Sequence, residues 1–208
     1  MTDIDIEYIV EQVTKRISEK LKITVEASGR HLHLSRESID ILFGKGYKLT
    51  KATELSQPGQ FRCNERVSIS GPKGTIVNVI VLGPERSQTQ VEVSKTDALI
   101  LGVKPPIRES GNLGGSLGIT ISTDKASLKI KEGLIIVRRH IHLTPDDANL
   151  FKVCDKDIVK AKIFGERPLI FDDVVIRVGK QYSTAMHIDY DEANACGYIK
   201  GTTAKIIK

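Results

Sequence analysis

The sequence of 208 residues predicts a mainly β protein with short helices, in which two small β-barrels follow an N-terminal amphipathic helix. Three observations support this prediction. One hexamer occurs twice, with nearly the same residues, 109 positions apart. Short β-branched runs alternate with glycine- and proline-rich turn signals, which is typical of small barrels. The first 21 residues instead carry apolar side chains at helical spacing.

The amphipathic helix is expected over residues 3–21. Its apolar positions recur every three or four residues and are Ile6, Ile9, Val10, Val13, Ile17 and Leu21. Asp3 can cap the start, and Lys20 suits the negative end of the helix dipole. Two interpretations stay open. The helix either packs on its own domain or docks as a peptide into a groove of another protein.

From residue 23 onward the sequence indicates one structural unit used twice: a strand, a His-x-His pair, a Ser or Thr cap, a short helix and further strands. The first such helix is expected over 36–44, and Thr144 with Pro145 starts the second. A third helix is expected over 191–196. The predicted strands are 23–27, 67–70, 75–81, 90–93, 119–122, 127–130, 135–137, 158–163, 168–178 and 203–206. The predicted turns are 71–74, 83–84, 105–106 and 114–115.

Composition argues against several function classes. The net charge of +5 is modest and spread along the chain, and aromatic residues are few, so we expect no nucleic-acid partner. A mildly basic surface would instead attract a small polyanion. Cys63, Cys154 and Cys196 are far apart and odd in number, which favours a reducing compartment. No apolar stretch approaches the ~18 residues that cross a bilayer, and the N-terminus lacks the features of a secretion signal. We therefore expect a soluble cytoplasmic protein.

Four of the five histidines lie in the repeated hexamer, which is RHLHLS at residues 30–35 and RHIHLT at 139–144. Alternate residues of a strand point to one face, so both imidazoles of a pair can bind one metal ion. Leu32 and Ile141 lie between the histidines and suit the opposite, buried face. Imidazole with carboxylates nearby favours zinc. Hydrogen-bonded core histidines are the alternative, and the duplication favours the metal sites.

A polar stretch at residues 83–92, with sequence GPERSQTQVE, contains two further candidates. Arg86 offers a rigid fork that matches phosphate or carboxylate. Glu92 lies on a predicted strand, where a carboxylate could complete a zinc site. On residue types alone, a solvated loop with a surface glutamate is the simpler interpretation.

Together, the two hexamers, the stretch at 83–92 and MHIDYDEANA at 186–195 resemble the PduL-type phosphotransacylases, the phosphate propanoyltransferase family. The likeness runs from about residue 23 to the C-terminus, with the motifs in the family's order and spacing. It implies a zinc acyltransferase of two barrels capped by short helices. The implied parts are an N-terminal helix (1–22), a first barrel (30–137), and a second barrel (138–208) that the strand 23–29 completes.

The resemblance also implies roles for individual residues. The ligands of two zinc ions would be His31, His33 and Glu92 for one ion, and His140, His142 and His187 for the other. Arg86 would bind phosphate. The contacts to coenzyme A would be Ala27, Ser28, Gly29, Lys73 and Asn194, although on residue type alone Lys73 is equally an ordinary turn lysine. Ile80 departs from the family, where arginine is often found, so a cofactor contact there would have to use the backbone.

The implied reaction converts propionyl-CoA or acetyl-CoA and phosphate to acyl phosphate and coenzyme A, reversibly. Of the three cysteines, only Cys196 lies near His187 in sequence, so direct attack by phosphate is favoured over a cysteine nucleophile. Two alternatives stay open. One is a dinuclear zinc hydrolase such as an acyl-CoA thioesterase, and the other is a non-enzymatic metal-binding module.

The resemblance further implies a homodimer. It also suggests that residues 1–21 form an encapsulation peptide. Such a peptide binds a shell protein and leads an enzyme into a bacterial microcompartment, here one for propanediol degradation. The residues themselves leave the acyl chain length and the direction of the reaction open, because one methylene changes binding by only ~1–3 kcal/mol.

Overall fold

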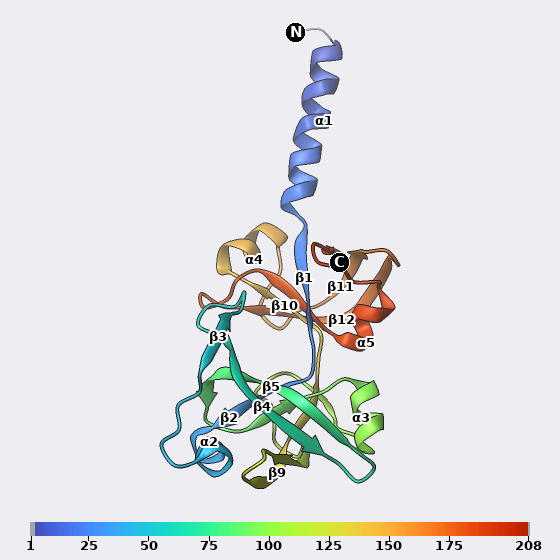
Figure 1. Ribbon diagram of the computed structural model, residues 1–208. Coiled ribbons are helices and arrows are strands. Elements are labelled where there is room, and N and C mark those ends of the chain that lie inside the picture. The colour runs from blue at the N-terminus through green and yellow to red at the C-terminus, as the bar shows by residue number, and fades with distance from the viewer. Residues whose placement is uncertain (1–2, 208) are drawn as a thin grey trace.

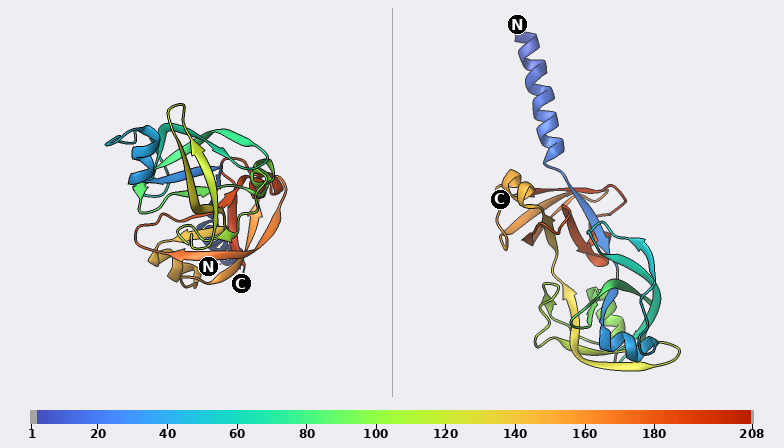
Figure 2. Two further views of the ribbon diagram at one scale, coloured as in Figure 1. Left: turned by 90° about the horizontal axis from the view of Figure 1, so that it is seen from below. Right: turned by 90° about the vertical axis from the view of Figure 1, so that its left-hand side faces the viewer.

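The computed structural model describes residues 3–207, and it contains two β-barrels with a single helix projecting from one of them (Figure 1). This helix is α1 (Asp3–Lys20), and it lies clear of both barrels in Figure 1 and in the perpendicular right-hand view of Figure 2. The mainly β architecture with short helices confirms the predicted fold class.

The C-terminal barrel closes from six strands in the order β1-β13-β10-β12-β11-β14. These strands are β1 (Ile23–Ser28), β10 (His140–Leu143), β11 (Ile158–Phe164), β12 (Leu169–Val178), β13 (Ala185–Asp189) and β14 (Thr203–Ile207). The short helices α4 (Pro145–Phe151) and α5 (Tyr190–Ala195) follow β10 and β13. The core is aliphatic and includes Ile23, Ile141 and Ile176, all of which are fully buried.

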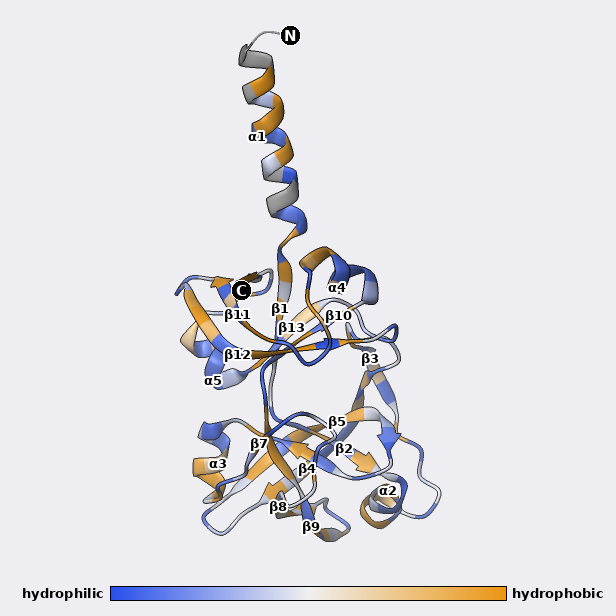
Figure 3. Ribbon diagram, turned by 180° about the vertical axis from the view of Figure 1, so that it is seen from behind, coloured by the Kyte–Doolittle hydropathy of each residue, from blue (hydrophilic) through white to orange (hydrophobic). Residues whose placement is uncertain are grey.

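The N-terminal barrel is a second closed ring, in which β4, β5, β2, β6, β9 and β8 each pair with the next and β8 pairs back with β4. Its strands are β2 (His31–Ser35), β3 (Lys51–Glu54), β4 (Phe61–Ser70), β5 (Thr75–Arg86), β6 (Gln90–Glu92), β7 (Ile107–Arg108), β8 (Leu117–Ser122) and β9 (Ser127–Val137). Strands β3 and β7 extend the ring at its edges. Its helices are α2 (Arg36–Phe43) and α3 (Lys95–Leu101). Figure 3 shows apolar residues along the strands of both barrels and also on the helices.

The two barrels are joined by an exchange of strands. Strand β1 directly precedes β2 in the chain but pairs in parallel with β13 of the C-terminal barrel. In the same way, β9 directly precedes β10 but pairs in parallel with β6 of the N-terminal barrel. The chain therefore crosses between the barrels twice, once just before each His-x-His strand. Both histidine pairs consequently begin at the junction of the two barrels.

The predicted helix caps and the predicted strand alternation are observed in both copies of the unit. Ser35 caps α2 by accepting a hydrogen bond from the backbone of Ser38. Thr144 caps α4, which has Pro145 in its first turn. The residues between the histidines, Leu32 and Ile141, are fully buried, as the strand alternation predicts.

Two local predictions were wrong, and one helix was missed. The expected turn at 83–84 lies inside β5, because Gly83 serves close packing rather than a turn: a Cβ there would come within 2.3 Å of the Phe61 ring. The expected strands 127–130 and 135–137 are one continuous strand, β9. Helix α3 was not predicted, although Ser94 and Asp97 form a capping box at its start.

Helix α1 makes the expected amphipathic pattern but does not pack on the barrels. The apolar side chains of Ile6, Ile9, Val10 and Val13 are each about half exposed. This excludes the interpretation that the helix packs on its own domain. Within residues 3–207, no helix is both long and apolar enough to cross a membrane.

Two truncations test the strand exchange. Deletion of residues 1–21 should leave the melting temperature unchanged, because α1 packs on neither barrel. Deletion of residues 1–28 also removes β1 with the buried Ile23 and Val25. Each such core side chain contributes ~2–5 kcal/mol, against a total stability of about 5–15 kcal/mol, so cooperative unfolding should be lost. Thermal unfolding followed by circular dichroism compares them, and equal melting curves would contradict the role given to β1.

Candidate metal centres

The N-terminal cluster is built by the antiparallel pairing of β2 and β6, which sets His31 directly opposite Glu92. One ligand atom from each of His31, His33 and Glu92 lies within 4.8 Å of the others, and all three residues are buried. The distance from His31 Nε2 to Glu92 Oε2 is 3.3 Å. His31 Nδ1 lies 2.8 Å from the Gly29 carbonyl oxygen, to which it donates, so the lone pair of Nε2 faces the cluster.

The C-terminal cluster repeats this geometry on β10 and β13, where His140 lies directly opposite His187. The ligand atoms of His140, His142 and His187 also lie within 4.8 Å of one another. His140 Nδ1 donates to the Arg138 carbonyl oxygen at 2.9 Å. In both copies the crossover segment therefore orients the first imidazole through the carbonyl oxygen two residues before it.

The donor sets fit zinc. Both ring nitrogens of His142 and the Nδ1 of His33 are buried without a hydrogen-bond partner among the described residues. Buried polar atoms usually have a partner, and a metal ion would supply it for an imidazole nitrogen. Two sets of three nitrogen or oxygen donors, each converging within a few ångströms, match the open three-ligand sites of catalytic zinc proteins.

The electrostatics keep most of these imidazoles neutral. Burial, reinforced by neighbouring imidazoles or Arg177, lowers the pKa of His140 to about 3, of His142 to about 2 and of His187 to about 4. Burial and the neighbouring His31 lower the pKa of His33 to about 3. Neutral imidazole is the form that binds a metal ion.

His31 and Glu92 shift each other's pKa. Burial acts to lower the pKa of His31, but the Glu92 carboxylate outweighs it and raises that pKa above its ordinary value. Burial likewise opposes ionisation of Glu92, yet His31, His33 and Arg86 together lower the pKa of its carboxyl group. The N-terminal cluster therefore carries a carboxylate that the C-terminal cluster lacks.

The two clusters face one cleft of about 340 Å³ at the junction of the barrels, and all six residues line it. Arg86, at the end of β5, also lines the cleft and donates to Ser110 Oγ at 3.2 Å. Its burial lowers the pKa of the guanidinium group. The structure thus brings the two predicted ligand sets and the predicted phosphate anchor into one cavity.

Among the residues that line the cleft and that sequence reasoning missed are Gln57, Ser110, Arg177 and Tyr182. Arg177 lies on β12 opposite His142, with its guanidinium group 5.7 Å from the Tyr182 ring centre and its Nε buried without a hydrogen-bond partner. Gln57 reaches across the junction and donates to the Ser183 carbonyl oxygen at 2.9 Å. Arg177 lies in no motif, so only the β10–β12 pairing could reveal it.

The predicted coenzyme A contacts are only partly brought together. Ala27, Ser28 and Gly29 line an adjoining cavity of about 440 Å³, together with Ile80. Lys73 and Asn194 line neither this cavity nor the metal cleft. Lys73 lies in the turn packed against the end of α3, with its backbone nitrogen 3.1 Å from the Leu101 carbonyl oxygen. Asn194 is exposed on α5.

Cys196 does not reach the reaction site. Its side chain is fully buried in the core of the C-terminal barrel, and its thiol donates to the Ala193 carbonyl oxygen at 3.4 Å. It is not among the residues that line the cleft. The structure therefore gives no support to a cysteine nucleophile at this position.

The fold and the site define a two-barrel protein with paired three-ligand centres and two arginines around a shared cleft. A sequence profile of the family described as phosphate propanoyltransferase matches residues 24–199. The chain is 62% identical over 200 residues to the phosphate propanoyltransferase of Clostridioides difficile (strain 630), covering 96% of each chain. It is 56% identical over 202 residues to that of Enterococcus faecalis (strain ATCC 700802 / V583), again covering 96% of each.

The phosphate propanoyltransferase of Thermotoga maritima (strain ATCC 43589 / DSM 3109 / JCM 10099 / NBRC 100826 / MSB8) is 50% identical over 200 residues, covering 96% of this chain and 95% of that protein. The chain belongs to the phosphate propanoyltransferase family, which confirms the predicted resemblance. It is therefore a transferase enzyme with phosphate acyltransferase activity. This result sets aside the non-enzymatic metal-binding module.

Proposed function

We propose that the chain transfers the acyl group of propionyl-CoA, or of acetyl-CoA, to inorganic phosphate, reversibly, at a dinuclear zinc site. The observation that carries this proposal is the convergence of two ligand clusters and two guanidinium groups on a single cleft. The names of the curated relatives support propionyl as the acyl group. In this reaction a phosphate oxygen bonds to the carbonyl carbon, the carbon–sulfur bond breaks, and sulfur leaves with the electron pair as coenzyme A thiolate.

The metal would be held by two sets of residues: His31, His33 and Glu92 in one centre, and His140, His142 and His187 in the other. Bound zinc supplies Lewis-acid polarisation of a phosphate oxygen or a thioester carbonyl group. With three protein ligands, each centre leaves a coordination position free for substrate.

The arginines of the cleft act on phosphate. Arg86 is half-buried and held by Ser110, so its guanidinium group is fixed before an anion arrives. Arg177 brings a second guanidinium group from the other barrel. Together they would orient phosphate, which lowers the entropic cost of bringing two substrates together. They would also exclude water from the acyl group. Direct transfer needs no protein nucleophile, in keeping with the burial of Cys196 away from the cleft.

Coenzyme A would lie along Ala27, Ser28 and Gly29, whose cavity adjoins the metal cleft and shares His31 with it. In this binding mode the thioester end would lie near the metal centres and the longer nucleotide end outside the cleft. Lys73 and Asn194 stay predicted contacts for that outer end.

Phosphate dependence distinguishes this function from a zinc thioesterase. Thiol release from propionyl-CoA should require phosphate, and Arg86→Gln should raise the KM for phosphate about 10- to 100-fold, since a charged hydrogen bond contributes ~1.5–3 kcal/mol. A thiol-reactive dye measures the rate. Arg167→Gln is the matched control, because Arg167 is exposed and does not line the cleft. Thiol release that ignores phosphate would favour the hydrolase.

Removal of one ligand tests the second centre. The variant His140→Ala should lose one of two bound zinc ions and at least about 100-fold in turnover, as expected when a metal that polarises a substrate is lost. Metal analysis of the purified protein, before and after chelation, gives the stoichiometry. Zinc added back should restore the chelated wild type but not the variant. Full activity in this variant would remove the second centre from the mechanism.

We further propose that α1 is an encapsulation peptide for a microcompartment shell protein, since its apolar side chains are exposed and packed on neither barrel. The enzyme would then act as a homodimer inside a bacterial microcompartment, in propanediol degradation, and otherwise in the cytoplasm.

Deletion of residues 1–21 should preserve turnover and abolish co-purification with shell protein. Within the full chain, Ile9→Asp with Val13→Asp should have the same effect, because these residues lie one helical turn apart on the apolar face. Gln12→Asp, which adds a negative charge at a polar position of the same helix, is the control. Shell binding that survives in the double variant would refute this role.

A further inference from the structure

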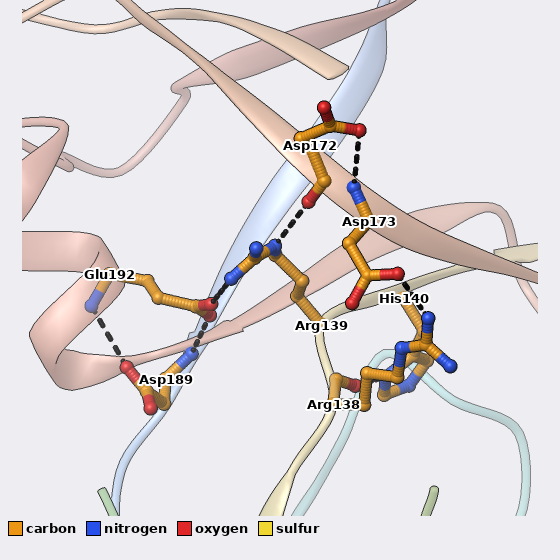
Figure 4. A network of polar contacts seen from close by, with 7 residues as sticks. All are labelled: Arg138, Arg139, His140, Asp172, Asp173, Asp189 and Glu192. Carbon is orange, nitrogen blue, oxygen red and sulfur yellow. Dashed lines mark hydrogen bonds and ion pairs between the residues drawn. The ribbon is translucent and has the colours of Figure 1, made fainter. Parts of the chain in front are cut away.

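An arginine directly precedes the first histidine of each pair, and its side chain points away from the metal centre to an acidic residue. Arg30 Nη2 lies 2.7 Å from Asp97 Oδ1. Arg139 Nη1 lies 2.6 Å from Glu192 Oε1, and Figure 4 shows this contact. The two ion pairs join corresponding places in the two copies of the structural unit.

The acidic partners occupy the same structural position. Each is the third residue of a short helix that begins with a capping box, Ser94 with Asp97 in α3 and Asp189 with Glu192 in α5. In α5 the backbone of Glu192 donates to Asp189 Oδ1 at 2.8 Å, and the backbone of Asp189 donates to Glu192 Oε2 at 3.0 Å. One oxygen of each acid therefore closes the cap, while the other faces the arginine.

Each capping residue follows the third ligand of its centre by two positions, since Ser94 follows Glu92 and Asp189 follows His187. The third ligands in turn lie opposite the first histidines in the strand pairing. The ion pair thus ties the start of the first-histidine strand to the end of the third-ligand strand. In each barrel it closes a ring of contacts around one metal centre.

Burial makes these ion pairs necessary, because a buried charge without a partner is costly. The Asp97 side chain is only 3% exposed, and its Oδ1 has no hydrogen-bond partner among the described residues, so the Arg30 ion pair is what compensates this buried charge. Arg139 is fixed a second time, because its Nε donates to the Asp172 carbonyl oxygen at 2.7 Å. Figure 4 shows this series of contacts, in which Arg139 joins Asp172 to Glu192 and Glu192 is hydrogen-bonded to Asp189.

We propose that Arg30 and Arg139 are equivalent positioning residues, each of which holds the third ligand of its own metal centre in register with the first histidine. The proposal rests on the zinc centres of the proposed function. It predicts an effect confined to one centre per arginine, whereas a merely structural ion pair would change the stability of the protein without favouring either centre.

The test measures zinc affinity in variants that retain one centre. His140→Ala keeps the N-terminal centre, and His31→Ala keeps the C-terminal centre. In the first background, Arg30→Gln should weaken zinc binding about 10- to 100-fold, as outer partners of metal ligands do, and Arg139→Gln should not. In the second background the pattern should reverse. Competition with a chromophoric chelator gives the affinities, and the visible spectrum of bound cobalt(II) reports the geometry of each centre.

Arg36→Gln is the matched control. Arg36 also forms a 2.7 Å ion pair, with Asp40, and its side chain is 42% exposed, close to the 40% of Arg30, but its partner lies within α2 and follows no third ligand. It should leave both affinities unchanged. The conservative variants Arg30→Lys and Arg139→Lys retain the charge and should lose less affinity than the glutamine variants. They also carry the test if a glutamine variant does not fold.

The outcomes separate this inference from the proposed function. Wild-type protein that binds no zinc would overturn both. Two tightly bound zinc ions in the wild type, with unchanged affinity in each arginine variant, would overturn the positioning role alone. So would an equal loss at both centres together with a lowered melting temperature, which would show general destabilisation.

Discussion

The two crossings between the barrels are the constraint on which the rest of the structure depends. Strands β1 and β9 bury their apolar side chains in the barrel opposite to that of the histidine strand that follows them. The chain then has only two residues in which to cross, Gly29–Arg30 and Arg138–Arg139. A connection of two residues fixes where the next strand must start. Both histidine pairs must begin at the junction, with the carbonyl oxygens of Gly29 and Arg138 in place to orient them.

Burial at this junction also sets the chemistry. A cleft shielded from water keeps most of the imidazoles neutral and strengthens every interaction between charges that remain. The two centres are alike in backbone geometry but differ by one unit of charge, because Glu92 occupies the position that His187 holds in the other. One duplicated unit thus provides two unequal positions, which suits a reaction between an anionic nucleophile and an uncharged thioester.

Much of the site could be predicted from the sequence because its signals are local. The alternation of His with Leu32 or Ile141 follows from the strand period, and Ser35 and Thr144 cap the helices as their positions predict. Helix α3 was missed, although the sequence contains its capping box, Ser94 with Asp97. The turn prediction at Gly83 was wrong for another reason, because glycine permits close packing as well as turns. Only the position of Phe61 reveals that Gly83 serves close packing.

The sequence by itself determined which residues can bind metal and which strands and caps carry them, because those properties depend on residue type and on spacing within one element. Only the tertiary structure decided that the two ligand sets share a cleft, that Arg177 joins Arg86 there, and that Lys73 and Asn194 do not. These facts depend on which strands pair between distant parts of the chain. Pairing is fixed by the burial of whole strands in two cores, and no short stretch of sequence contains that information.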